Sequence, residues 1–319
     1  MSKYDVITIG SATVDNFFYT NIPELHKKRD NYIAYPIGSK FLVKEIDIET
    51  GGSATNTATS FSRLGLKSGT IICLGNDKNA DIILSELKKE KIDFLGTKVN
   101  EKTGDSIVLD SKEHNRTILI YYGANSKLDF KKLDKKKLNA KWFYFGSLHG
   151  KSFETQKKLM SYAKKNKIKI AYNPSQYSAK KGKELYPLLK KVDLLILNKE
   201  ESELVLEKKE SIKKMLKLLH EKGPKLVCIT DGEKGAYFSD GNSIKELNTH
   251  SIKVVERTGA GDAFASSLLA GLMKKDTETA LKMALINSES VIKHRGAKNK
   301  LLTWKEMNSK LKKVRVKLK

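Results

Sequence analysis

The stretch Thr258-Gly259-Ala260-Gly261-Asp262-Ala263-Phe264 combines a bare backbone turn with the start of an apolar helix, which small and apolar residues continue to Gly271. A helix that opens in this way presents unpaired backbone N–H groups, and the positive end of its dipole, to whatever lies before it. Such helix ends bind anions, most often phosphate. The stretch therefore predicts a phosphate-binding helix start.

Asp262 falls in the first turn of that helix, beside the predicted anion site. One interpretation is that its carboxylate only stabilises the helix dipole. The other is that it accepts the proton of a hydroxyl group that attacks the phosphate. The backbone N–H groups of Gly259, Ala260 and Gly261 would then stabilise charge on the moving phosphoryl group. We predict direct in-line transfer with Asp262 as the base.

A second glycine pair, in Gly51-Gly52-Ser53-Ala54-Thr55-Asn56-Thr57-Ala58, also opens a helix, and Leu64-Gly65 closes it. The two motifs, in this order and far apart in the chain, resemble the two signatures of the ribokinase (PfkB-type) carbohydrate kinase family. The resemblance extends from Val6 to about Trp304. It implies a kinase that uses ATP and Mg²⁺ to phosphorylate a hydroxymethyl group of a sugar or nucleoside.

Short apolar strands alternate with helices along the chain. We expect strands at 6–10, 70–74, 142–145, 168–172, 192–197 and 226–230, and helices at about 153–165, 211–222, 260–274 and 277–294. Repeated β-α units predict a mostly parallel sheet covered on both faces, with ligands beyond the carboxyl ends of its strands. Together with the resemblance, the pattern predicts an α/β fold: a ribokinase-like three-layer α/β/α sandwich within one kinase domain, 1–319.

Two segments, 16–48 and 103–123, interrupt this pattern. Each contains runs typical of β-hairpin strands, including Tyr32-Ile33-Ala34-Tyr35 in the first and a turn at Glu113-His114-Asn115 in the second. The resemblance implies a small β-sheet lid that closes over the substrate and often forms a homodimer contact. The alternative is that both segments extend an edge of the main sheet. We favour the lid.

Several turns are assigned to the nucleotide and its metal by the resemblance. The residues assigned to nucleotide binding are Thr230, Gly232, Gly235, Arg257, Thr258 and Asn287. Asn198 and Glu201 follow a strand and match the family's Asn-x-x-Glu motif, which holds Mg²⁺ through water. An Asn and a Glu at this spacing also form an ordinary helix capping box. Arg257 has a second interpretation too, as a plain surface charge.

The acceptor residues implied by the resemblance are Asp15, Gly51, Gly52 and Asn56. A carboxylate such as that of Asp15 accepts two hydrogen bonds at once, which suits a diol. Ser53 replaces the lysine of ribokinase itself, which argues against strict ribose specificity. Ribose, fructose-type sugars, sugar phosphates and nucleosides therefore all remain open as acceptors.

Glu256 is a further departure from the family, because aspartate is commoner at this position. Related turns, including Arg295-Gly296-Ala297, form a monovalent-cation site in some members. The longer side chain of Glu256 leaves open whether this protein has such a site.

The composition suits a cytoplasmic enzyme. Of 319 residues, 39% are hydrophobic, which argues against global disorder. Cys73 and Cys228 each fall in a predicted buried strand, so we interpret them as core residues in a reducing compartment. The N-terminus does not resemble a signal peptide, and no apolar run approaches the roughly 20 residues needed to span a bilayer. We expect no membrane partner.

The net charge of +24 raises the alternative of a nucleic-acid-binding protein. However, lysine heavily outnumbers arginine and is scattered in pairs and triplets such as 135–137, whereas base-reading surfaces rely on arginine and aromatics. We favour a general lysine bias, in a field that would attract ATP. A catalytically idle, ligand-sensing relative is the other alternative, although it would not need Asp262.

Overall fold

The computed structural model describes residues 2–27, 30–112 and 115–313. Its centre is a nine-stranded sheet in the order β17-β16-β15-β14-β13-β12-β1-β6-β8. Its strands are β1 (Tyr4–Ile9), β6 (Ser68–Ile71), β8 (Asp93–Phe94), β12 (Ala140–Phe145), β13 (Lys169–Tyr172), β14 (Leu194–Asn198), β15 (Leu226–Thr230), β16 (Ala236–Ser239) and β17 (Ile244–Leu247). Seven neighbouring strands are parallel, and only β16 and β17 pair antiparallel.

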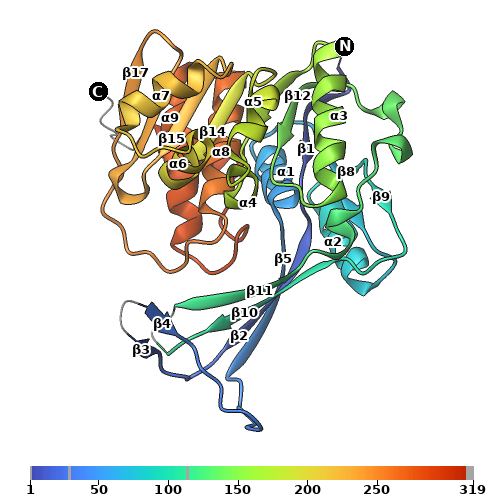
Figure 1. Ribbon diagram of the computed structural model, residues 1–319, viewed down its shortest axis with the longest axis vertical. Helices are drawn as coiled ribbons and strands as arrows, with labels where there is room; N and C mark the ends of the chain where they lie inside the picture. Colours follow the sequence, from blue (N-terminus) through green and yellow to red (C-terminus); the bar gives the residue numbers. More distant parts are fainter. Residues whose placement is uncertain (1, 28–29, 113–114, 314–319) are drawn as a thin grey trace.

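Helices cover both faces of this sheet (Figure 1), which confirms the predicted three-layer sandwich. One face packs against α3 (Lys151–Lys165), α5 (Tyr186–Leu189), α6 (Lys199–Leu206) and α7 (Ile212–His220), and the other against α1 (Ser53–Arg63), α8 (Ala260–Lys274), α9 (Thr277–Ile292) and α10 (Trp304–Leu311). The remaining short elements are α2 (Lys78–Lys89), α4 (Gln176–Ala179), β7 (Cys73–Leu74), β9 (Thr97–Lys98) and five 3₁₀ turns at 123–126, 130–132, 135–137, 182–185 and 232–234.

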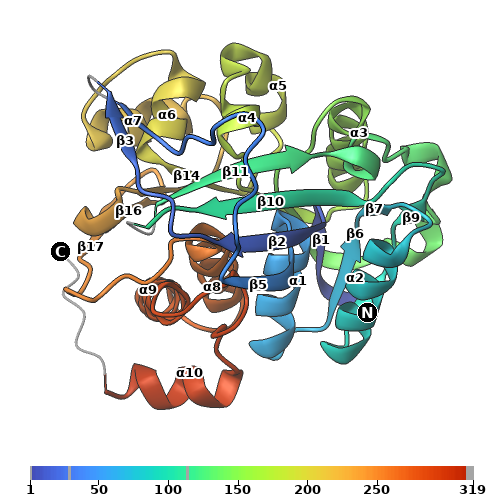
Figure 2. The same ribbon diagram turned by 90° about the horizontal axis from the view of Figure 1, so that it is seen from below.

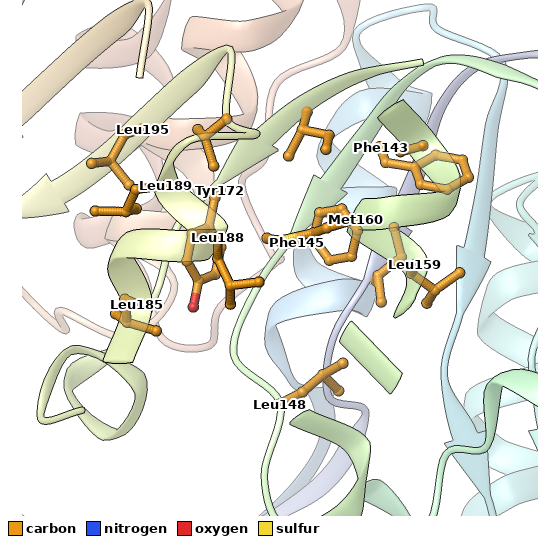
Figure 3. Packing of buried hydrophobic residues seen from close by; sticks show 14 of the residues in the cluster. Phe143, Phe145, Leu148, Leu159, Met160, Tyr172, Leu185, Leu188, Leu189 and Leu195 are labelled. Carbon is orange, nitrogen blue, oxygen red and sulfur yellow. The ribbon is translucent and has the colours of Figure 1, made fainter. Parts of the chain in front are cut away.

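Both faces of the central strands are apolar because both are covered. In β12, Phe143 and Phe145 pack toward α3, while Trp142 and Tyr144 pack toward the layer of α1 and α8. Figure 3 shows the first of these clusters, in which Phe145 lies close to Met160 of α3. None of the described helices combines the length and the apolar character that crossing a membrane requires.

A separate four-stranded sheet has the order β11-β10-β2-β5 and is called the small sheet below. It consists of β2 (Thr13–Tyr19), β5 (Glu45–Gly51), β10 (Gly104–Asp110) and β11 (Arg116–Tyr121). Because β2 follows directly after β1, the small sheet begins at the carboxyl end of the central strands and projects away from the three layers (Figure 1). The two interrupting segments therefore do not extend an edge of the main sheet.

Two local predictions were wrong. The run 32–35 is not a strand: β4 (Asp30–Tyr32) ends at its first residue and pairs only with β3 (Leu25–Lys27), whereas the partner of β2 is β5. The expected strand 70–74 is split into β6 and β7, which pair with different strands. In the predicted turn at 113–115, Glu113 and His114 lie outside the described residues, as does Arg29 in the first segment.

Candidate active site

The start of α8 has the geometry that its glycines predict. Gly259 has φ 77°, and a Cβ there would lie 2.6 Å from the Cα of Ala297, so only glycine fits this close approach. Beside Gly261, by contrast, no atom outside its chain neighbours and its own helix backbone lies within 4 Å of the position of an added Cβ. The first-turn amides of α8 thus border open space, as an anion site requires.

The Gly51-Gly52 pair brings α1 against the turn between β1 and β2. Gly52 has φ 97°, and a Cβ there would lie 2.5 Å from the carbonyl oxygen of Ser11. A Cβ on Gly51 would lie 1.9 Å from Oδ2 of Asp15. The two glycines therefore allow the end of β5 to pack directly against the carboxylate that we assign to the acceptor.

The two glycine motifs meet in the structure. Asn56 in α1 donates a hydrogen bond from Nδ2 to Oδ2 of Asp262, at 2.8 Å. One turn further along each helix, Ser266 of α8 donates to Ser60 of α1 at 2.7 Å, and Figure 2 shows the two helices side by side. Asn56 is 6% exposed, and its Oδ1 has no hydrogen-bond partner within the described part of the chain. That oxygen remains available to a ligand hydroxyl.

Three ionisable groups lie near one another at this junction. Burial raises the pKa of Asp262 to about 6, against the opposing effects of the Asn56 hydrogen bond and the charge of Lys298. Burial, followed by the charges of Glu200 and Asp262, raises the pKa of Glu201 to about 7. Burial is the main cause of the raised pKa of Tyr144 in β12, and the charges of Asp262 and Glu201 raise it further. Asp262 and Glu201 therefore share one weakly solvated space.

Asn198 and Glu201 form a complete capping box at the start of α6. Oδ1 of Asn198 accepts from the Glu201 amide at 2.7 Å, and Oε2 of Glu201 accepts from the Asn198 amide at 3.0 Å. The described residues contain no group of three or more His, Cys, Asp or Glu side chains that could hold a metal directly. Glu201 nevertheless keeps its second carboxylate oxygen, Oε1, outside the capping box. The residues present fit a water-mediated metal and not a direct cage.

A cavity of about 610 Å³ adjoins the start of α8. Of the residues assigned to the nucleotide or to the transfer step, Gly232, Arg257 and Ala260 border it. Residues that the sequence did not suggest complete the wall: Glu233, Thr249, His250, Ser251, Ile252, Val254, Leu285, Ser288, Glu289 and Ile292. Apolar side chains from α9 and from the 252–254 segment make this space suitable for a planar base.

The other nucleotide assignments lie around this cavity or away from it. Thr230 ends β15 directly beside Asn198 of β14, so both strand ends meet at one edge. Thr258 immediately precedes the α8 turn and is half-buried. Gly235 has φ 100°, and a Cβ there would lie 1.9 Å from the carbonyl oxygen of Leu247, so the tight β15–β16 turn explains this glycine.

Asn287 does not reach the cavity. Its side chain is fully buried, donates to Ser267 at 2.7 Å and accepts from the Leu302 amide at 2.9 Å. These bonds join α8, α9 and the segment before α10. The geometry therefore gives no support to nucleotide binding by Asn287, and its neighbours Ser288 and Glu289 border the cavity instead.

Asp15 lies at the end of the small sheet nearest the large sheet. Its Oδ1 accepts a hydrogen bond from Ser106 of β10 at 2.6 Å. Burial raises the pKa of Asp15, opposed by hydrogen bonds from Ser106 and Thr13 and by the charge of Lys298. Lys298 thus influences both Asp15 and Asp262.

Lys298 and Arg116 have roles that no sequence motif indicated. Lys298 is 6% exposed, and its ammonium group donates to Thr50 of β5 and to Glu86 of α2. Arg116 of β11 forms an ion pair with Oε1 of Glu256, whose Oε2 accepts from the Gly296 amide at 2.9 Å. Only the position of Lys298 directly after the 295–297 turn could have drawn attention to it.

The family model described as pfkB family carbohydrate kinase matches residues 25–304. The chain belongs to the pfkB family of carbohydrate kinases. Among its relatives within this family, the chain is 26% identical to an ATP-dependent 6-phosphofructokinase of Thermoanaerobacterium thermosaccharolyticum, over 92% of this chain and 90% of that protein. It is 28% identical to a cytidine kinase of Thermococcus kodakarensis, over 77% and 88%.

The pfkB membership agrees with the fold. A ribokinase structure from Arabidopsis thaliana, solved with ribose and ATP, superimposes with a TM-score of 0.81 at 21% identity and covers 98% of this chain and 99% of its own. At that identity the likeness shows the ribokinase fold alone. Fold and family together make this protein a kinase of the sugar and nucleoside kinase group.

Proposed function

We propose that this protein transfers the γ-phosphoryl group of ATP to a primary hydroxyl group of a sugar or nucleoside, with Asp262 as the base. One observation supports this most strongly: the hydrogen bond between Asn56 and Asp262 brings the two glycine motifs into one site. The buried, unpartnered Oδ1 of Asn56 lies on the same side chain and would accept a hydrogen bond from an acceptor hydroxyl. An acceptor held there would present its hydroxyl group close to Asp262.

The transfer follows from this arrangement. Asp262 accepts the proton of the acceptor's hydroxymethyl group as the oxygen forms a bond to the γ-phosphorus and the bond from phosphorus to the ADP oxygen breaks. The amides of Gly259, Ala260 and Gly261 stabilise negative charge on the transferred group. Thr230, Gly232, Gly235, Arg257 and Thr258 are proposed to contact the nucleotide, whose base would enter the 610 Å³ cavity.

Magnesium is the expected metal because phosphoryl transfer from ATP uses it to neutralise the phosphate oxygens. Glu201, supported by Asn198, would hold Mg²⁺ through water, since the described residues offer no direct cage. The small sheet is proposed to act as a lid that excludes water from the transfer.

Turnover with a panel of acceptors tests this proposal. Ribose, fructose, fructose 6-phosphate, cytidine and inosine would each be mixed with ATP and Mg²⁺, and ADP release measured. We expect ADP release well above the acceptor-free rate for at least one of them, whereas a uniform background rate would count against the kinase assignment. Nucleosides belong in the panel because a cytidine kinase is among the relatives.

Glu201→Gln should raise the concentration of Mg²⁺ needed for half-maximal rate and leave acceptor affinity nearly unchanged. The reason is that the neutral amide removes the charge facing a hydrated cation while keeping a cap on α6. Glu200→Gln is the matched control, because Glu200 is exposed on the same turn. A metal titration that is the same in both variants and in the wild type would favour a purely structural capping box.

We expect turnover to be independent of monovalent cations. Both carboxylate oxygens of Glu256 are already engaged, one by the Arg116 guanidinium and the other by the Gly296 amide. Initial rates measured in K⁺ and in tetramethylammonium at equal ionic strength should therefore agree. Activation by K⁺ would show that a cation displaces Arg116 from Glu256.

The outer face of the small sheet is proposed to form a homodimer contact. Strand register places exposed apolar side chains together there: Ile46, Ile48, Ile107, Leu119 and Tyr121. Exposed apolar patches of this kind commonly mark interfaces. Leu119→Lys should shift the mass measured by light scattering from dimer toward monomer, whereas Ile120→Lys, on the opposite face, should not. A monomeric wild type would contradict the proposal.

A further inference from the structure

The face of the small sheet that carries Asp15 is rich in carboxylates and is called the inner face here. The register of β2 with β5 places Asp15 opposite Glu49. Asp47 and Glu45 share this face because alternate residues of a strand point to the same side. On β10, Ser106 is paired with Asp15, so Asp110 lies on the inner face as well.

Contacts with the large sheet's layers show that the inner face borders the active site. The guanidinium of Arg295 lies 4.2 Å from the ring centroid of Tyr19 and 3.1 Å from Oε2 of Glu45. Glu49 packs so closely against Gly296 that a Cβ there would lie 1.9 Å from its Oε2. The carboxylates of the inner face therefore border the space between the small sheet and the start of α8.

The side of this space opposite the small sheet, formed by α6, α8 and the loop before α8, carries further carboxylates. Asp262 lies at this space through its hydrogen bond to Asn56, Glu201 is close enough to Asp262 for their charges to interact, and Glu256 lies in the loop before α8. Burial raises the pKa of Glu49, and the charges of Glu256 and Asp47 add to that effect. Glu256 and Glu45 are paired with Arg116 and Arg295, so the field that opposes a further negative charge comes mainly from Asp15, Asp47, Glu49 and Asp262.

Three of the cations that reach this space are already paired, whereas the exposed Lys253 also borders it, beside Asp110 and Arg116. Arg116 binds Glu256, and Arg295 binds Glu45. Lys298 donates to Thr50 and Glu86, and Glu86 belongs to α2, outside the inner face. Among the described residues, the buried or half-buried cations that reach this space all have carboxylate partners, so a phosphate held there would have to rely on the exposed Lys253.

We propose that the acceptor is an uncharged, hydroxyl-rich molecule, either a free sugar or a nucleoside, and not a sugar phosphate. This rests on the proposed function and narrows its substrate class. Phosphate is favoured only at the start of α8, at the opposite end of the site, where backbone amides would bind the phosphates of the nucleotide. Carboxylates on the inner face accept hydrogen bonds from hydroxyl groups but repel a phosphate dianion.

Matched acceptor pairs test the inference, each with the phosphate placed away from the reacting primary hydroxyl. The pairs are ribose and ribose 1-phosphate, and cytidine and cytidine 3′-monophosphate; fructose is compared with both its 1-phosphate and its 6-phosphate, so that each of its two primary hydroxyls is left free in one of the esters. In the most active pair, we expect kcat/KM to be at least about tenfold higher for the uncharged member, as expected for repulsion by several nearby carboxylates. Equal or faster turnover of the phosphorylated member overturns the inference and leaves the proposed function standing. No turnover in any pair contradicts both.

A charge reversal on the inner face provides a second test of the inference. Asp47→Lys should raise kcat/KM for the phosphorylated member relative to the uncharged one by about tenfold, because a like charge becomes an opposite one. Asp81→Lys makes the same charge change on α2, at a side chain that is 76% exposed, and should leave the ratio nearly unchanged. If both variants leave the ratio unaltered, the inner-face carboxylates do not select acceptor charge and the inference fails.

Discussion

Asp262→Asn should reduce turnover by about 10² to 10⁴ while nucleotide binding stays largely intact, since this is the usual contribution of a general base. The amide cannot accept the hydroxyl proton, but the backbone of the α8 start is unchanged. Rates of ADP release and equilibrium binding of ATP, measured side by side, separate the two effects. Wild-type turnover in the variant would show that Asp262 is not the base.

The pH dependence of the wild type gives a companion test of Asp262. Burial raises its pKa to about 6, so it becomes protonated, and unable to accept a proton, as the pH falls below that value. We expect kcat/KM to decline on this acid side. Asp81→Asn removes a charge from the exposed surface of α2. It should leave the turnover rate and the decline of kcat/KM at low pH as they are in the wild type.

Asp15→Ala should raise the KM for the acceptor by about tenfold to a hundredfold, because losing a hydrogen bond to a charged group costs roughly 1.5–3 kcal/mol. The KM for ATP should hardly change, since the nucleotide cavity is bordered by other residues. Ser106→Ala removes only the hydrogen bond to Asp15 and should have a smaller effect on the acceptor.

Asp15 could instead serve only to stabilise the small sheet. In that case the melting temperature of Asp15→Ala would fall while the KM of the folded fraction stayed at the wild-type value. Measuring melting temperature together with both KM values distinguishes the two roles. Equal weakening of ATP and acceptor would contradict the division of the site into an acceptor end and a nucleotide end.

The local features of the site were predictable from sequence, because each depends on neighbouring residues. Gly259 and Gly52 have positive φ values that a side chain would strain, and a helix start leaves most of its first amides without a partner inside the helix, although that of Ala260 donates to the carbonyl of Arg257. The capping box of Asn198 and Glu201 could be predicted from its spacing alone. The alternation of apolar strands and helices indicated a mostly parallel sheet covered on both faces, and with the family resemblance it predicted the three-layer α/β/α fold.

Features that depend on contacts between distant segments were not predictable. The run 32–35 has a strand-like composition, yet the segment that pairs with β2 is β5. A strand forms only where a partner lies in register. Asn287 follows no local rule that would distinguish a ligand contact from a buried structural amide. No sequence motif marks residues 249–252, which border the cavity beside the start of α8, since only the packing of α9 against them creates the space.

The sequence by itself determined the glycine-rich start of α8, the position of Asp262 in its first turn and the class of fold, because backbone geometry and hydrophobic periodicity are set by residues close together in the chain. Only the tertiary structure decided that Asn56 meets Asp262, that Lys298 lies buried between β5 and α2, and that carboxylates line the inner face of the small sheet. Those arrangements depend on strand order, register and burial, which bring together charges from segments that the sequence keeps apart.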